Sequence, residues 1–179
     1  MLPVVLAVVA AAVVIVLIAA AMKPATFRVV RSRRMQAPAE RVFPLINDFH
    51  EWAQWSPYEK LDPAMNKTFG GAASGRGSTY AWSGNSKAGQ GRMEIVESVP
   101  SSRVAIDLQF EKPWRSRMMA TFTIASAADG TTVTWAMEGP SQFMGKVMGL
   151  FINMDQMIGK DFDAGLGTLR TLAEAGPAQ

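Results

Sequence analysis

Residues 103–138, RVAIDLQFEKPWRSRMMATFTIASAADGTTVTWAME, decide the fold because their apolar side chains recur at every second position. The segments 103–110, 117–124 and 131–138 each place one apolar face opposite a more polar one. The pair Asp129–Gly130 is a turn signal between the last two segments. Alternation with period two, interrupted by turns, predicts antiparallel strands that bury one face and leave the other in water.

The same pattern extends toward the start of the chain, and a different one ends it. Further strands are predicted at 27–35, 79–83 and 92–99, and a short helix is predicted after Pro38. A three- and four-residue spacing then predicts a long amphipathic helix over 145–174. Its apolar positions are Met144, Val147, Phe151, Met154, Ile158, Phe162, Leu169 and Leu172. Strands followed by a long helix indicate an α+β domain.

The composition excludes several classes of function. The chain has 179 residues, a net charge of +3, no cysteine and one histidine. Disulfides, thiolate metal sites, a cysteine nucleophile and a histidine metal cage are therefore excluded. Basic residues are not interleaved with stacking aromatics, so binding of nucleic acid is not favoured. We expect neither a metal ion nor a cofactor.

The first 22 residues contain no charged or polar side chain. About 20 helical residues span the hydrocarbon core of a bilayer, so this segment predicts a transmembrane anchor. A cleaved signal peptide is the alternative, although a basic start is missing and the apolar run is long for one. A buried soluble helix is disfavoured because the segment has no polar face. Five basic residues follow the segment, which predicts a single-pass inner-membrane protein with its domain in the cytoplasm; they are Lys23, Arg28, Arg31, Arg33 and Arg34.

Five motifs together resemble the START/polyketide-cyclase-like (SRPBCC) superfamily, and in particular its small membrane-anchored bacterial members. The motifs are FPLINDFHEWAQWSPYEKLDPAM (43–65), YAWSGN (80–85), GQGRMEI (89–95), VTWAMEGP (133–140) and MGLFINMDQMIGKDFDAGL (148–166).

The resemblance implies a helix-grip fold, in which a curved antiparallel sheet wraps around a long C-terminal helix and leaves an apolar pocket. It divides the chain into an anchor at 1–22, a linker at 23–26, the domain at 27–174 and a tail at 175–179. Arg33 and Arg34 depart from the family pattern because aliphatic residues usually stand there, and a basic edge facing the bilayer would explain them.

Aromatic residues and methionines are the candidates for lining such a pocket. Trp52 and Trp55 are three residues apart and share a helix face, so one ring is expected in the core and the other in the cavity. Simple core packing is the alternative for both. The full candidate set is Trp52, Trp55, Tyr80, Trp82, Met93, Phe110, Trp114, Trp135, Phe151, Met154 and Ile158.

Polar groups that could orient a ligand or catalyse a reaction are few. His50 is the only side chain that ordinarily titrates near neutral pH, and Glu94, Glu138 and Asp155 are the other weak catalytic candidates. Asn153 is a further candidate for a polar ligand contact, and a solvent-facing position is the alternative for each carboxylate. The spacing of the aspartates near 155–163 does not favour a metal site.

Three classes of function remain open on this basis. Binding or transfer of a hydrophobic small molecule or a lipid is favoured. A cyclase-, dehydratase- or hydrolase-like enzyme would need a buried titratable group in the same cavity. A ligand-independent, membrane-tethered interaction module would have a filled core and no cavity.

Overall fold

The computed structural model describes residues 1–141, 143–150 and 153–175. In this part of the chain seven antiparallel strands form one sheet in the order β1-β7-β6-β5-β4-β3-β2. The strands are β1 (Thr26–Met35), β2 (Asn66–Gly71), β3 (Ser78–Ser83), β4 (Gln90–Val99), β5 (Arg103–Lys112), β6 (Ser116–Ala127) and β7 (Gly130–Pro140). The helices are α1 (Leu2–Ala21), α2 (Ala39–Asn47), α3 (Trp52–Trp55), α4 (Phe143–Met148) and α5 (Met154–Ala175), with 3-10 turns η1 (Phe49–Glu51) and η2 (Pro57–Lys60).

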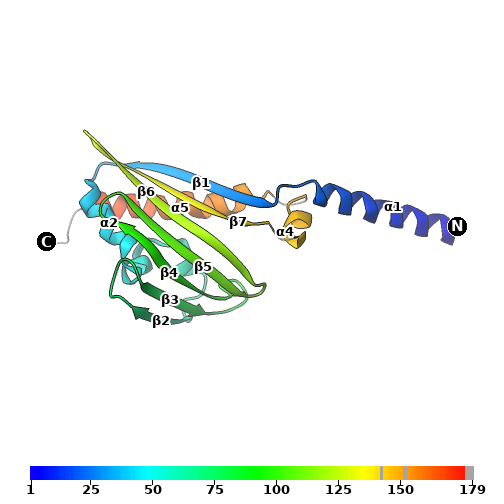
Figure 1. Cartoon of the computed structure of the whole chain (residues 1–179), viewed down its shortest axis with the longest axis horizontal. Helices are drawn as coiled ribbons and strands as arrows, with labels where there is room; N and C mark the ends of the chain where they lie inside the picture. Colours follow the sequence, from blue (N-terminus) through cyan, green and yellow to red (C-terminus); the bar gives the residue numbers. More distant parts are fainter. Residues whose placement is uncertain (142, 151–152, 176–179) are drawn as a thin grey trace.

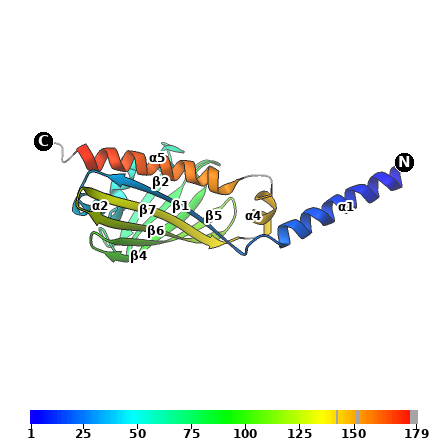
Figure 2. The ribbon, with the colours of Figure 1, turned by 90° about the horizontal axis from the view of Figure 1, so that it is seen from above.

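The sheet curves around α5, which lies along β1 on the concave face (Figures 1 and 2). The short helical segments from α2 to η2 cover the rest of that face beside α5. Every second residue of a strand points to this face, and most of these inward-facing residues are apolar. The predicted helix-grip α+β fold is therefore confirmed.

Two elements differ from the sequence-based expectation. The helix expected over 145–174 is two helices, α4 and α5, because a turn at Gly149–Leu150 ends the first. The Gly149 amide donates to the Gly145 carbonyl at 2.9 Å, and a glycine at this position is a common helix terminator. Strand β2 was not predicted, because all six of its residues are exposed and no buried face marks it.

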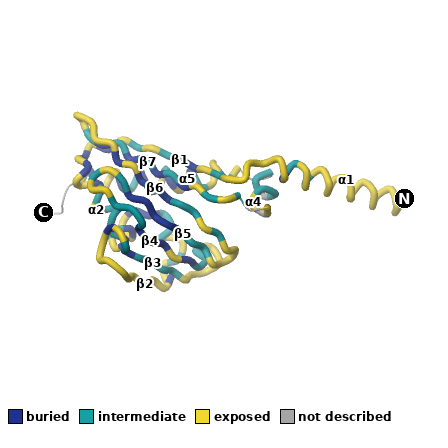
Figure 3. The backbone as a smooth tube through the Cα atoms, viewed as in Figure 1, coloured by how far each residue is buried: buried dark blue, intermediate teal, exposed yellow. Residues whose placement is uncertain are grey.

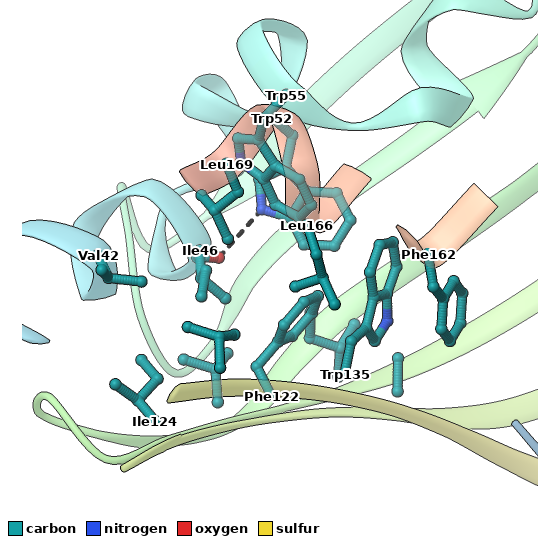
Figure 4. Close-up of a cluster of buried hydrophobic side chains, with 14 of the residues drawn as sticks. Val42, Ile46, Trp52, Trp55, Phe122, Ile124, Trp135, Phe162, Leu166 and Leu169 are labelled. Atoms are coloured by element: carbon teal, nitrogen blue, oxygen red, sulfur yellow. Dashed lines mark hydrogen bonds between the residues drawn. The ribbon is translucent and has the colours of Figure 1, made fainter. Parts of the chain in front are cut away.

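Two neighbouring rows of inward-facing side chains form the centre of the core. The strand register places them side by side across the sheet, and α2, α3 and α5 cover them (Figure 4). The rings of Trp135 and Phe162 stack at 3.9 Å between sheet and helix. The rows consist of Val29, Met137, Ala120, Ile106 and Ile95, and of Trp135, Phe122 and Val104, all buried.

Helix α1 leaves the domain at one end, here called the anchor end (Figures 1 and 2). The strand register puts the β3–β4 turn (84–89) and the β5–β6 turn (113–115) at this end, together with the start of β1. The β6–β7 turn (128–129) lies at the opposite, far end. Helix α1 is exposed along nearly its whole length (Figure 3) and is long and apolar enough to span a bilayer, criteria that a signal sequence also meets.

The arginines of β1 do not form a basic edge facing the bilayer. Arg33 points inward, and its guanidinium lies 3.9 Å from the position of a Cβ built on Gly167 of α5. Arg34 points outward and forms an ion pair with Asp129 at the far end of the domain. The expectation of a membrane-facing basic edge at 33–34 is therefore wrong, because both residues lie at the end of β1 that is distant from α1.

Candidate ligand-binding site

Apolar side chains on the concave face become more exposed toward the anchor end. The register joins Phe27, Gly139, Met118, Leu108 and Met93 in one row across five strands. Phe27, Met118 and Leu108 are half-buried, whereas the two rows behind them are buried. The following set of half-buried residues is called the apolar rim: Phe27, Tyr58, Trp82, Leu108, Phe110, Met118 and Ile158.

Gly91 shapes the sheet side of the apolar rim. A Cβ on Gly91 would meet the Trp82 ring at 2.6 Å, so the indole lies flat on the strand only because residue 91 has no side chain. The Trp82 ring contacts Phe110 edge-on at 5.5 Å between centroids, and its indole N–H donates to the Ala88 carbonyl at 3.0 Å. The ring is thereby fixed across the ends of β3 and β4.

Tyr58 supplies a hydrogen-bonding group next to this apolar surface. Burial raises the pKa of its phenol above the ordinary value, and the charge of Asp161 raises it further. Burial also raises the pKa of the Asp161 carboxyl. The Tyr58 hydroxyl therefore stays neutral at physiological pH and can donate a hydrogen bond or accept one.

The indole N–H of Trp135 is a further polar group on the concave face. Trp135 is 3% exposed, and its Nε1 has no hydrogen-bond partner within the part of the chain described. A buried donor without a partner ordinarily costs about 1–3 kcal/mol. The edge of the Tyr58 ring lies beside the Trp135 ring, at 6.3 Å between centroids.

A buried carboxylate, Glu59, was missed by the sequence analysis. Its side chain is 8% exposed, accepts a hydrogen bond from the Tyr80 hydroxyl at 2.7 Å and forms an ion pair with Lys67. Burial and the Glu59 carboxylate raise the pKa of Tyr80. These contacts tie η2 to β2 and β3, so they hold Tyr58 in place from the adjacent position in the chain. The only signal in the sequence was a carboxylate inside an aromatic segment.

Several predicted pocket residues lie in the core instead. Trp52 and Trp55 are 5% and 1% exposed, and their indole N–H groups donate to the carbonyls of Ile46 and Leu45. Figure 4 shows both rings packed above Leu166 and Phe122. The expectation that one of the two rings lines a cavity is wrong, because both indoles serve core packing. Tyr80, Met93 and Trp135 are also buried.

The remaining candidates separate into three groups. Trp82, Phe110 and Ile158 belong to the apolar rim, and Met154 is half-buried at the start of α5. Trp114 is 65% exposed in the β5–β6 turn, so its predicted place in the pocket is wrong. Phe151 lies outside the described residues.

The four weak catalytic candidates do not come together. His50 is exposed, stacks on Phe69 at 4.3 Å and hydrogen-bonds Asp48. Glu94 and Glu138 alternate with the inward-facing residues of β4 and β7, so both lie exposed on the convex face. None of these three carboxylate or imidazole groups faces the apolar rim.

Asp155 is part of a structural contact between α5 and β1. Its carboxylate accepts hydrogen bonds from the Arg31 guanidinium at 2.9 and 3.1 Å, which hold the pKa of Asp155 below its usual range. Arg31 also pairs with Asp163 and lies directly over Gly159, where a Cβ would overlap the guanidinium. Among the described residues no group of three acidic, histidine or cysteine side chains could hold a metal ion.

Two shallow hollows lie at opposite ends of the domain. The one at the anchor end has a volume of about 530 Å³ and is bordered by Phe27, Met154, Asn153, Lys23 and Lys146. It shares Phe27 with the apolar rim and adjoins the residues that follow α1. The other hollow, of about 490 Å³, is bordered by residues 36–40 and 126–131 at the far end.

A comparison with known protein families shows to which family the chain belongs. Residues 26–174 match the family described as "Polyketide cyclase / dehydrase and lipid transport". The chain therefore belongs to this family, in agreement with the resemblance found in its motifs. No curated protein matches the chain.

Solved structures share the fold at low sequence identity. Protein CV1439 from Chromobacterium violaceum is 20% identical with a TM-score of 0.59, and the match covers 85% of this chain and 99% of that one. Protein MLL2253 from Mesorhizobium loti is 17% identical with a TM-score of 0.59, covering 85% and 100%. The di-domain ARO/CYC BexL from the BE-7585A biosynthetic pathway is 15% identical with a TM-score of 0.61, covering 89% of this chain and 53% of that one. At these identities the likeness establishes the fold alone.

Proposed function

We propose that this protein is anchored in the inner membrane by α1 and binds or transfers a hydrophobic small molecule or a lipid at its apolar rim. The observation that carries the proposal is the gradient of burial on the concave face, from a closed core to the half-buried rim at the anchor end. Apolar surface that stays partly wet gains about 25 cal/mol per Å² when a ligand covers it. The family description, which includes lipid transport, supports this class of ligand.

The position of the rim matches a ligand drawn from the bilayer. The rim, the 530 Å³ hollow and the exit of α1 all lie at the anchor end. The Tyr58 hydroxyl would orient a polar group of the ligand, because apolar pockets commonly hold a few polar groups for that purpose. Basic residues after α1, including Lys23 and Arg28, favour a cytoplasmic domain.

An enzyme remains the alternative, and the titratable group beside the rim that it could use is Asp161, whose charge acts on Tyr58. His50, Glu94, Glu138 and Asp155 lie away from the rim. Glu59 is buried, yet Tyr80 and Lys67 already engage its two oxygens. The side chains at the rim therefore agree better with binding of a hydrophobic molecule than with a cyclase- or dehydratase-like reaction.

The test uses residues 23–179, which retain the whole core cluster because its members run from Val29 to Ala173. Native mass spectrometry and organic extraction of this purified fragment should show a co-purifying apolar molecule, and a fluorescent fatty acid should bind to it. A fragment that is empty and takes up no fatty acid would refute the proposal.

Adjacent methionines on β6 offer a matched pair of variants. Met118 points into the rim, and Met119 points to the convex face opposite Asp107 and Glu138. Met118→Arg should abolish uptake of the fatty acid, because it places a charge on the apolar surface. Met119→Arg should leave uptake unchanged, since the new charge lies on the convex face opposite Asp107 and Glu138. Equal uptake by the two variants would place the ligand elsewhere.

A further inference from the structure

The anchor end carries a concentration of exposed apolar side chains outside α1. Of the six large apolar side chains that are exposed in the described part of residues 23–175, four lie at this end. They come from separate segments: the stretch after η2, the β5–β6 turn, α4 and the first turns of α5. The four are Leu61, Trp114, Phe143 and Met157.

Trp114 is the most exposed of the four. It is 65% exposed, whereas Trp52, Trp55 and Trp135 are at most 5% exposed and Trp82 is half-buried. It lies in the short turn between the end of β5 at Lys112 and the start of β6 at Ser116. Tryptophan is enriched at membrane–water interfaces, because its ring is apolar and its indole N–H stays hydrated.

Basic residues surround these apolar groups. Lys112 and Arg115 flank Trp114 in the β5–β6 turn, next to the acidic Glu111, whereas the guanidinium of Arg117 is engaged by Asp107. Lys146 lies on α4, the helix that packs against α1. Basic side chains next to a bilayer are attracted to anionic headgroups, so the charge of this end complements such a surface.

We propose that the anchor end of the domain docks on the bilayer that α1 spans, with Trp114 inserted among the headgroups. Figures 1 and 2 both show α1 leaving on the side where α4 and the β5–β6 turn lie, so the anchor and the docking face meet the same membrane. Docking would press the apolar rim against the lipid surface. The inference rests on the membrane attachment proposed above and adds a second point of contact.

Tryptophan fluorescence can test the docking, because α1 contains no tryptophan. The full chain would be reconstituted in nanodiscs of anionic phospholipid whose acyl chains carry bromine, a contact quencher of tryptophan. The wild-type emission should be quenched, and Trp114→Phe should reduce the quenching, because Trp52, Trp55 and Trp135 are buried and only Trp82, in the half-buried apolar rim, can still meet the lipid. A double variant, W114F with A128W, moves the ring to the exposed turn at the far end and should restore no quenching.

Two outcomes would overturn the inference. Equal quenching in the wild type and W114F, or none in either, would show that Trp114 is not in the bilayer. A chain that does not co-elute with the nanodiscs would refute the membrane attachment and the docking together. The fatty-acid assay on residues 23–179 stands apart from both, so a failure of docking is distinguishable from a failure of ligand binding. Replacing Lys112 and Arg115 by glutamate should also weaken the quenching in anionic nanodiscs.

Discussion

Replacing Gly165 by alanine should destabilise the domain, whereas the same replacement at Gly167 should stabilise it. Both glycines lie inside α5, where alanine is favoured over glycine by about 1 kcal/mol. At Gly165 the new Cβ would lie 2.9 Å from Cδ of Pro57 and 3.1 Å from Cζ3 of Trp135. At Gly167 its nearest neighbour is the Arg33 guanidinium at 3.9 Å, an ordinary contact.

The net effects follow from these distances. Overpacking a tight core typically costs about 1–3 kcal/mol, so Gly165→Ala should end between roughly zero and a loss of about 2 kcal/mol. Gly167→Ala should gain about 1 kcal/mol, which corresponds to a rise in Tm of about 2–4 °C for a domain of this size.

Urea and thermal unfolding of residues 23–179, followed by circular dichroism, would measure both changes. Equal stabilisation by the two alanines would show that Pro57 and Trp135 do not press against α5. In that case the close approach of η2 to the helix, which positions Tyr58, would be wrong as well.

Three further predictions concern stability. Trp55→Phe should cost about 2–4 kcal/mol in urea unfolding, because it removes packing volume and takes the indole donor away from the half-buried Leu45 carbonyl. Trp114→Phe should change stability by less than about 0.5 kcal/mol, and a comparable loss in both variants would contradict the difference in burial between Trp55 and Trp114. Hydrogen bonds from Arg117 lower the pKa of Asp107 in the folded protein below its value in the unfolded chain. The ionised Asp107 therefore stabilises the fold above the unfolded pKa, and this stabilisation is lost as the pH falls through the folded pKa. Asp107→Asn should therefore flatten the acid limb of the stability profile, and an unchanged limb would refute the pairing.

The strands could be predicted from the sequence because the sheet buries one face. Residues 103–138 alternate clearly, and their inward positions are the ones that the core rows use. Strand β2 could not be predicted in this way, because both of its faces are exposed and no buried face imposes an apolar alternation on its sequence. The break between α4 and α5 was missed because helical spacing continues across it, while the turn depends on glycine at 149.

The candidate site was harder to predict than the fold. The sequence does not show whether an aromatic side chain packs in the core, lines a pocket or is exposed to water. Trp55, Trp82 and Trp114 illustrate these three cases. Only the strand register and the elements packed against each residue distinguish the three environments. Glu59 was missed for a similar reason, because its partners Lys67 and Tyr80 follow it by 8 and 21 residues and stand on two strands that the sequence did not show to be paired.

The gradient of burial along the concave face also has a consequence for how this protein can evolve. The rows that hold the fold together lie behind the rim, around Trp135 and Ile106, and the half-buried residues Met118 and Leu108 lie in front of them. Substitutions at partly exposed positions ordinarily cost less than those in a closed core. Members of a lineage could therefore exchange rim side chains, and with them the size and shape of the molecules they accept, while the same scaffold continues to fold.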